Sequence, residues 1–242
     1  MREALRRPGC VVEVFATAEA SQRHRDLQQL ADEGSVGWQV ADRRALASLT
    51  DTRTPQGIVA VCRAVDVAGS ELDWGRLRLV AVCADDRDPG NAGSLVRCAD
   101  AAGADAVVLA GRSVDPYNPK AVRASTGSLF HVPVTVAESV EQTVAALRSA
   151  GLTVLAADGA GDVSLDELDA ATLRRPTGWV FGNEAWGIPA ATSALADAVV
   201  RVPIYGRAES LNLATAAALC LYASARRQRD GDRGGRVDHP QA

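Results

Sequence analysis

Residues 77–111 read LRLVAVCADDRDPGNAGSLVRCADAAGADAVVLAG, the pattern of a strand, a loop, a helix and a second strand. The runs at 77–84 and 105–111 are continuously apolar, as is typical of parallel strands covered on both faces. Apolar residues at i, i+3, i+4 and i+7 from Ala92 predict a helix near 92–102. This unit predicts an α/β fold on a parallel sheet, in which ligands bind beyond the carboxyl ends of the strands.

The same alternation continues toward the C-terminus. Further strands are expected at 131–137, 152–158, 178–183 and 197–204, with helices near 138–150 and 163–173. We therefore assign 77–225 to one doubly wound domain. Residues 226–242 are polar and charged, and we expect a disordered tail because they cannot bury apolar surface.

A smaller α/β domain is expected at residues 1–64. Its strands are expected at 11–17, 38–41 and 57–64, with a polar helix near 19–33. Residues 65–76 lose periodicity and are expected to form a linker.

Composition narrows the class of protein. The chain has 242 residues, 47% of them hydrophobic, and a formal net charge of −4, so any basic surface for nucleic acid must be local. No apolar run is long enough to span a bilayer, and the first residues lack the apolar core of a signal peptide. The five cysteines are scattered among apolar residues. We expect a cytoplasmic protein without disulfides, membrane association or a metal site.

Common nucleotide-binding patterns are absent. The chain has neither a G-x-G-x-x-G turn nor a P-loop. The nearest candidate is the Asp158–Asp162 loop, DGAGD, which follows a predicted strand. Two glycines in such a loop are weak evidence for a cofactor, and a plain turn explains them better.

The first of three more specific stretches is DPGNAGSLVRCA, residues 88–99. Asn91 is expected to be the N-cap of the following helix. Arg97 projects away from the apolar stripe of that helix, so its guanidinium is available to a partner. Taken alone, a solvated helix arginine explains Arg97 better.

The second stretch is VFGNEAWGIP, residues 180–189. Gly182 and Gly187 permit close approach of backbone to a ligand. Glu184 follows a buried strand, where a carboxylate normally needs a partner. The alternative is that Glu184 serves as a cap for a short helix after Pro189.

The third stretch runs from VPI at 202–204 to SLNLAT at 210–215. The helix that follows is apolar nearly all round, so it is expected to lie between layers or at a subunit contact. Ser210 is a candidate cap for this helix. Asn212, a polar residue at the start of a buried helix, is expected to make a specific hydrogen bond.

Together these stretches resemble the SpoU/TrmH family of RNA 2′-O-ribose methyltransferases, in the SPOUT class. The matching motifs are N-x-G-x-x-x-R, G-N-E-x-x-G-I and S-L-N-x-x-x-A, in the family's order, and SVDPYNPKAVRAS at 113–125 also looks like the family. The resemblance covers about 85–225. Residues 1–64 look like the L30e-type RNA-binding domain often attached to this family, but without its usual first strand, so we expect an N-terminally incomplete form of that domain.

The resemblance implies a fold and a cofactor. The expected fold is a SPOUT-type parallel sheet with a C-terminal trefoil knot, and the knot forms the pocket for S-adenosylmethionine. The residues expected to bind this cofactor are Gly182, Val202, Leu211, Ile204, Leu213 and Ala157. Family members act as homodimers. The apolar helix at 211–225 fits a subunit contact, although burial within one chain explains it equally well.

The resemblance also implies a mechanism. Arg97 matches the arginine of the first motif, which is thought to help activate the ribose hydroxyl. A guanidinium stays protonated, so we prefer that Arg97 binds substrate phosphate and polarises the hydroxyl. The other catalytic positions would orient Arg97 and the ribose; they are Asn91, Glu184, Ser210 and Asn212. Arg123 is expected to hold another phosphate.

The expected activity is therefore transfer of a methyl group to a ribose 2′-hydroxyl, with ribosomal RNA favoured as the substrate. The alternatives are a tRNA 2′-O-methyltransferase, a base-methylating SPOUT enzyme and a non-catalytic RNA-binding protein of this fold. The presence of both Arg97 and Asn212 disfavours the non-catalytic alternative, and the S-L-N motif favours ribose over base.

Overall fold

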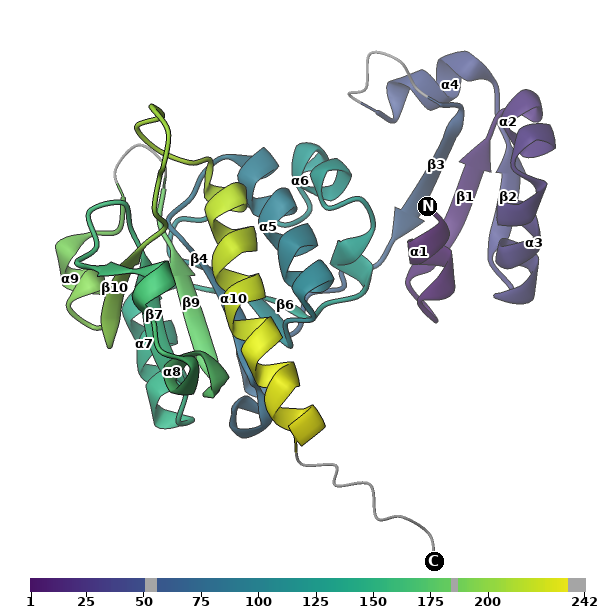
Figure 1. Ribbon diagram of the computed structural model, residues 1–242. Helices are drawn as coiled ribbons and strands as arrows, with labels where there is room; N and C mark the ends of the chain where they lie inside the picture. Colours follow the sequence, from purple (N-terminus) through teal and green to yellow (C-terminus); the bar gives the residue numbers. More distant parts are fainter. Residues whose placement is uncertain (51–55, 184–186, 235–242) are drawn as a thin grey trace, which may run out of the picture. The chain divides into compact units, whose positions relative to one another are not determined.

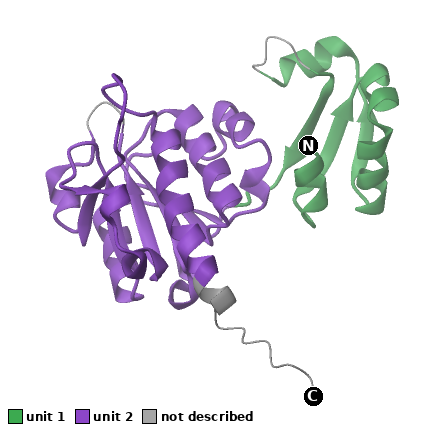
Figure 2. Ribbon diagram, in the orientation of Figure 1, with its two compact units in different colours: residues 1–65 green, residues 66–242 purple. Residues whose placement is uncertain are grey.

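The computed structural model describes residues 1–50, 56–183 and 187–234, with side chains as far as Asp230 (Figure 1). The chain divides into two compact units, residues 1–65 and 66–242 (Figure 2). Each unit has its own sheet. Among the described residues, no helix combines the length and apolar character needed to cross a membrane.

The first unit is built on a three-stranded sheet in the order β2-β1-β3. Its strands are β1 (Val11–Ala16), β2 (Gly37–Val40) and β3 (Ile58–Cys62), and its helices are α1 (Arg2–Arg6), α2 (Ala18–Arg23), α3 (Arg25–Glu33) and α4 (Arg43–Ser48). β1 pairs with β2 in parallel and with β3 antiparallel. The single helix expected near 19–33 is wrong: His24 leaves helical dihedrals (φ −115°, ψ 48°), which ends α2 and starts α3.

The second unit contains a seven-stranded sheet in the order β6-β5-β4-β9-β7-β10-β8. Its strands are β4 (Leu79–Ala84), β5 (Ala106–Ala110), β6 (Val134–Ala137), β7 (Thr153–Ala157), β8 (Val163–Ser164), β9 (Thr177–Phe181) and β10 (Ala198–Arg201). All the pairings are parallel. The parallel α/β fold expected from the continuous apolar runs is confirmed. The trefoil knot stays a prediction.

Helices cover both faces of this sheet. They are α5 (Pro89–Ala102), α6 (Pro119–Ala124), α7 (Val140–Ser149), α8 (Ala170–Arg174), α9 (Ala190–Ser193) and α10 (Leu213–Gly234), with 3-10 turns η1 (Gly69–Glu71), η2 (Trp74–Arg76), η3 (Ser128–Phe130) and η4 (Leu165–Glu167). Figure 1 shows α5 and α10 side by side along one face, where they pack together.

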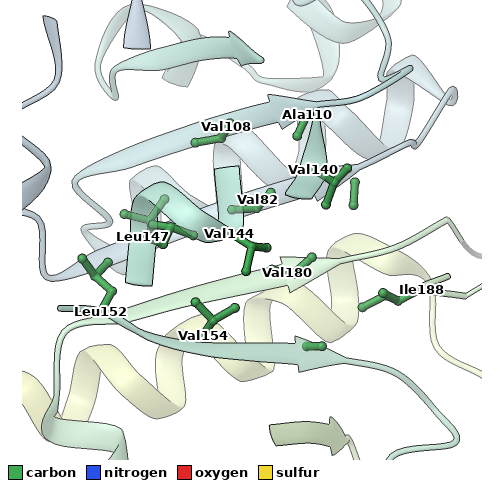
Figure 3. Close-up of a cluster of buried hydrophobic side chains, with 13 residues drawn as sticks. Val82, Val108, Ala110, Val140, Val144, Leu147, Leu152, Val154, Val180 and Ile188 are labelled. Carbon is green, nitrogen blue, oxygen red and sulfur yellow. The ribbon is translucent and has the colours of Figure 1, made fainter. Parts of the chain in front are cut away.

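The core divides between the two faces because successive strand residues point in opposite directions. On one face, Val144 and Leu147 of α7 pack with strand valines such as Val82 and Val180 (Figure 3). On the other face, the indole nitrogen of Trp179 donates to the Ser224 hydroxyl of α10 at 2.9 Å. Both faces are therefore covered, which explains why the strands are apolar without alternation.

The segment 163–173, expected to be a helix, is instead β8, η4 and α8. Gly161 lies against the β10 backbone, where a Cβ would come within 2.8 Å of the Arg201 nitrogen. This approach lets Val163 pair with Val200 and extend the sheet by one edge strand. The hydrophobic pattern could not reveal this, because β8 has only two residues.

The disordered tail expected from Arg226 is wrong as far as Gly234, because α10 continues to that residue. Polar anchors hold this extension. The buried Gln228 amide donates to the carbonyls of Arg78 at 3.1 Å and Arg175 at 2.8 Å. The Arg229 guanidinium donates to the Ala102 carbonyl at 3.1 Å. Disorder is expected from the sequence because this segment has little apolar surface to bury. The polar contacts of Gln228 and Arg229 stabilise the end of α10 instead.

Candidate active site

A cavity of about 840 Å³ opens at the carboxyl ends of the central strands. The loops after β7, β9 and β10 and the start of α10 form its walls. All six residues expected to bind the cofactor line it: Ala157, Gly182, Val202, Ile204, Leu211 and Leu213. Ser210 lines it as well. The sequence-predicted set is therefore brought together in one place.

The cavity combines apolar walls with acidic groups. Phe181 at its base is buried, whereas Ile204 at its rim is 37% exposed. The carboxylates of Asp158 and Glu209 are among the lining residues. Arg201 also lines it, but its guanidinium donates to the carbonyls of Gly161 and Asp162 in the neighbouring loop. The acidic lining favours a ligand that carries positive charge.

Close backbone contacts surround Gly182, directly after β9. A Cβ on Gly182 would lie 2.4 Å from the Gly187 carbonyl oxygen, so only glycine fits there. Gly187 itself has a φ of +66°, in the left-handed region. The Asp158 carboxylate accepts from the backbone nitrogens of Ile188 at 3.1 Å and Ala160 at 2.9 Å. Asp158 therefore ties the loop after β7 to the loop after β9.

Asn91 and Asn212 meet beside the start of α10. The Asn212 side-chain nitrogen donates to the Asn91 side-chain oxygen at 3.0 Å. The Asn212 oxygen accepts from the backbone nitrogens of Ala214 at 3.0 Å and Thr215 at 3.4 Å, so Asn212 caps α10. These contacts join the first and third motifs.

The expected N-cap role of Asn91 is wrong. Asp88 caps α5, since its carboxylate accepts from the nitrogens of Gly90 at 2.6 Å and Asn91 at 3.1 Å, and Pro89 occupies the first helical position. Pro at this position costs nothing because its missing N–H would have had no helical partner. The earlier start of the helix places Asn91 within the first turn, where its side chain reaches Asn212.

Asp86 lies at the centre of the same cluster and is fully buried. One oxygen accepts from the Asn183 side-chain nitrogen at 3.0 Å and from the Asp88 backbone nitrogen at 3.3 Å. The other oxygen, Oδ2, has no hydrogen-bond partner among the described residues. Burial raises the pKa of Asp86, and the Asp88 backbone N–H, followed by the Asn91 and Asn183 side chains, partly opposes this rise in pKa.

The structure does not bring every expected residue to the cavity. Arg97 is exposed on α5 and Arg123 is exposed on α6, and neither is a lining residue. The two helices pack closely, because a Cβ on Gly93 would lie 2.2 Å from the Ala121 carbonyl oxygen. Glu184 lies outside the described residues.

Sequence reasoning missed Asp86 and Asn183 as site residues, although Asn183 belongs to the second motif. Each follows a strand of the structure, β4 or β9, at the edge where ligands bind. Asp158 lies in the loop around residues 157–159, which the family resemblance places at the cofactor pocket, and this loop lines the cavity. No group of three histidine, cysteine or carboxylate residues that could hold a metal occurs in the part of the chain that the structure describes.

Family models match both units. Residues 78–222 match the SpoU rRNA Methylase family, and residues 1–68 match the RNA 2′-O ribose methyltransferase substrate-binding domain. The chain belongs to the SpoU rRNA methylase family. It is a SpoU RNA 2′-O-ribose methyltransferase that uses S-adenosylmethionine, and the family expected from the three motifs is confirmed.

Similar proteins agree with this family. The chain is 35% identical to the Bacillus subtilis 23S rRNA (guanosine(2553)-2′-O)-methyltransferase RlmP over 92% of this chain and 84% of that protein. It is 29% identical to 23S rRNA (guanosine-2′-O-)-methyltransferase RlmB of Nitrosomonas europaea over 93% of this chain and 88% of that protein. Its fold is similar to that of SpoU methyltransferase AviRb from Streptomyces viridochromogenes, solved with AdoMet (TM-score 0.78, 31% identity, 95% and 88% of the two chains).

Proposed function

We propose that this SpoU methyltransferase methylates a ribose 2′-hydroxyl of 23S ribosomal RNA at the cavity beside Asn91 and Asn212. The observation that carries this assignment is the convergence of the six expected cofactor residues on one cavity. The Asn91–Asn212 hydrogen bond adds two expected catalytic residues at the adjoining start of α10. The similarity to the 23S rRNA methyltransferases RlmP and RlmB supports ribosomal RNA as the substrate.

The cavity fits S-adenosylmethionine, which supplies an electrophilic methyl group on a sulfonium. Apolar side chains such as Val202, Ile204 and Leu211 offer a surface for the flat adenine ring. The carboxylates of Asp158 and Glu209 complement the positive charge of the sulfonium and the ammonium. The tight backbone packing at Gly182 keeps this wall of the cavity fixed.

Arg97 is proposed to bind an RNA phosphate and to polarise the attacking hydroxyl. A ribose hydroxyl is a poor nucleophile, so its proton must leave as the new bond forms. A guanidinium donates hydrogen bonds and does not accept them, so phosphate or water accepts that proton. The exposure of Arg97 on α5 leaves it accessible to RNA. Arg123, exposed on the adjacent α6, is proposed to bind a second phosphate.

Asn91 and Asn212 are proposed to orient the ribose at the start of α10, together with Ser210 and Glu184. Their mutual hydrogen bond fixes the two side-chain amides relative to each other. Ser210 is exposed and lines the cavity, so its hydroxyl can reach a bound substrate. Glu184 is included on the family motif alone.

We propose further that the protein works as a homodimer through α10. This helix exposes two large hydrophobic side chains three residues apart, Leu219 at 46% and Tyr222 at 51%. Tyr222 donates to the Ala101 carbonyl of α5 at 3.1 Å, so the two helices form one surface. Arg97 is exposed on the same α5. A contact between copies through this surface would bring Arg97 near the partner's site.

The first unit is proposed to bind RNA, in agreement with its match to a substrate-binding domain. We place the protein in the cytoplasm, together with its ribosomal RNA substrate. The experiment is transfer of labelled methyl from S-adenosylmethionine to ribosomal RNA and to tRNA, followed by nucleoside analysis. A 2′-O-methyl nucleoside from 23S rRNA supports the proposal. A methylated base, or a product from tRNA alone, contradicts it.

A further inference from the structure

Asp86 is a buried acid that the proposed mechanism does not use. It is fully buried, and its Oδ2 atom has no hydrogen-bond partner among the described residues. A carboxyl group in such a place is costly, since burial removes its hydration and only part of that loss is replaced. Buried polar groups with incomplete partners often have a role beyond stability.

The backbone directs Asp86 inward. The preceding residue, Asp85, has a φ of +54°, which turns the chain sharply at the end of β4. The Asp85 carboxylate accepts from the Arg112 nitrogen at 2.9 Å, and the Asp86 carbonyl accepts from the Val114 nitrogen at 3.0 Å. These two hydrogen bonds to residues that follow β5 therefore hold Asp85 and Asp86 in place at the end of β4.

Two asparagines from different motifs face this one acid. Asn183 of the second motif donates its side-chain nitrogen to Asp86 at 3.0 Å. Asp86 also accepts from the Asp88 backbone nitrogen at 3.3 Å, and the Asp88 carboxylate accepts from the Asn91 backbone nitrogen at 3.1 Å. The Asn91 side-chain oxygen in turn accepts from Asn212 of the third motif. The hydrogen bonds therefore run from Asn183 through Asp86, Asp88 and Asn91 to Asn212, and they connect all three motifs.

An ionised carboxylate can only accept hydrogen bonds, so it fixes which end of each amide faces it. Asn183 presents its nitrogen to Asp86, so its oxygen points away from the acid. The Asn91 oxygen accepts from Asn212, which leaves the Asn91 nitrogen available to the acid whose pKa this side chain lowers. A flip of the Asn183 amide would place two acceptors against each other.

We propose that Asp86 is a positioning residue for methyl transfer, which sets the amide orientation of Asn91 and Asn183 and so holds the three motifs in their reactive arrangement. The inference rests on the proposed function. It predicts that loss of the acid lowers kcat, because the orienting groups are misplaced, while the cavity walls still bind S-adenosylmethionine.

The test compares purified Asp86→Val, Asp86→Asn and wild type by kcat, KM for S-adenosylmethionine and Tm. We expect kcat of Asp86→Val to fall by about tenfold to a hundredfold with KM for S-adenosylmethionine within about threefold of wild type. The Tm of Asp86→Asn should stay close to that of wild type, because its side-chain oxygen can still accept from Asn183 and no buried charge remains. Asp86→Asn should retain more activity, since its oxygen still accepts from Asn183.

The matched control is Asp105→Asn. Asp105 accepts from the Arg78 and Leu79 nitrogens at the opposite end of β4, so this change should leave kcat unaltered. The second test combines Asp86→Asn with Asn91→Ala. Because Asp86 also acts through Asn183, we expect the double variant to lose less kcat than the product of the two single losses.

Unchanged kcat in both Asp86 variants overturns the inference and leaves the proposed function intact. Losses in kcat that multiply in the double variant overturn it too, as does a kcat loss that merely follows a loss of Tm. Should Asp86→Val fail to fold, the Asp86→Asn variant and its double variant decide the question. If wild type methylates no RNA, the proposed function itself fails.

Discussion

The Asn212 side chain donates to the Asn91 side chain over 3.0 Å, across 121 positions of sequence. The oxygen of the same side chain caps α10, so one amide both caps a helix and joins two motifs. Substitution of Asn212 is therefore expected to have two effects, one on the stability of α10 and one on methyl transfer.

Asn212→Ala should reduce both stability and methyl transfer. Removal of the cap should lower the free energy of unfolding by about 1 kcal/mol. Asn118→Ala removes a comparable cap from α6, where Asn118 accepts from the Lys120 nitrogen at 2.9 Å, and should alter stability alone. Thermal unfolding and methyl-transfer assays on both variants measure the two effects. Equal activity of the two variants would contradict a role for Asn212 in the reaction.

Gly182→Ala should abolish tight binding of S-adenosylmethionine. Its Cβ would meet the Gly187 oxygen at 2.4 Å and the Ile188 Cγ1 atom at 2.6 Å, so the cavity wall must shift. Gly159 lines the same cavity, but a Cβ added there would meet nothing within 4 Å, which makes Gly159→Ala the control. Isothermal titration calorimetry should show a loss of at least about tenfold for Gly182→Ala, or about 1.4 kcal/mol. Similar affinities for both variants would refute the assignment of this wall.

Arg97→Ala should lower methyl transfer strongly without weakening cofactor binding, because Arg97 is not a lining residue of the cavity. Arg97→Lys should recover little activity, since an ammonium cannot bind phosphate through a planar pair of donors. Arg76→Ala, at an exposed arginine in η2, is the control. Steady-state kinetics with RNA and with S-adenosylmethionine test this. Full turnover of Arg97→Lys would exclude the proposed two-donor contact.

Asp86 should also make stability depend on pH. Its folded pKa is raised by burial above the unfolded value of about 3.9, so the folded state holds this proton more tightly. The contribution of Asp86 to stability is therefore most favourable at low pH and declines as pH rises from about 3.9 through the folded pKa. The Tm of Asp86→Asn relative to wild type should rise between about pH 4 and pH 8.

The opposite trend is expected at Asp88. Hydrogen bonding from Lys120 lowers the pKa of Asp88, so its stabilising contribution is present above about pH 3.9 and is lost below. The Tm of Asp88→Asn relative to wild type should therefore change little between about pH 4 and pH 8 and should rise as the pH falls below about 3.9, modestly because this pair is exposed. If differential scanning calorimetry showed the same pH trend in Tm for both variants, burial would not be what raises the pKa of Asp86.

Local pattern predicted much of the site. Continuous apolar runs place the strand ends within three residues, with the largest error at β10, which ends at Arg201 rather than at 204. In a parallel sheet the carboxyl ends share one edge, so Gly182 and Val202 are expected near each other. The apolar stripe that starts at Ala92 predicted α5 but not its first residue, Pro89. The choice of cap depends on competition between nearby polar side chains, and Asp88 with Pro89 takes the position expected for Asn91.

The sequence by itself determined the family through its three motifs, and the resemblance to that family named the residues that line the cavity. Periodicity determined the parallel sheet, because it records which side chains are buried and roughly where each strand stops. Only the tertiary structure decided that Asp86 is buried between Asn91 and Asn183, and that Asn212 meets Asn91. Those contacts depend on strand order and on the packing of α10 against α5, and residues more than ninety positions apart leave no joint periodic signal for such packing.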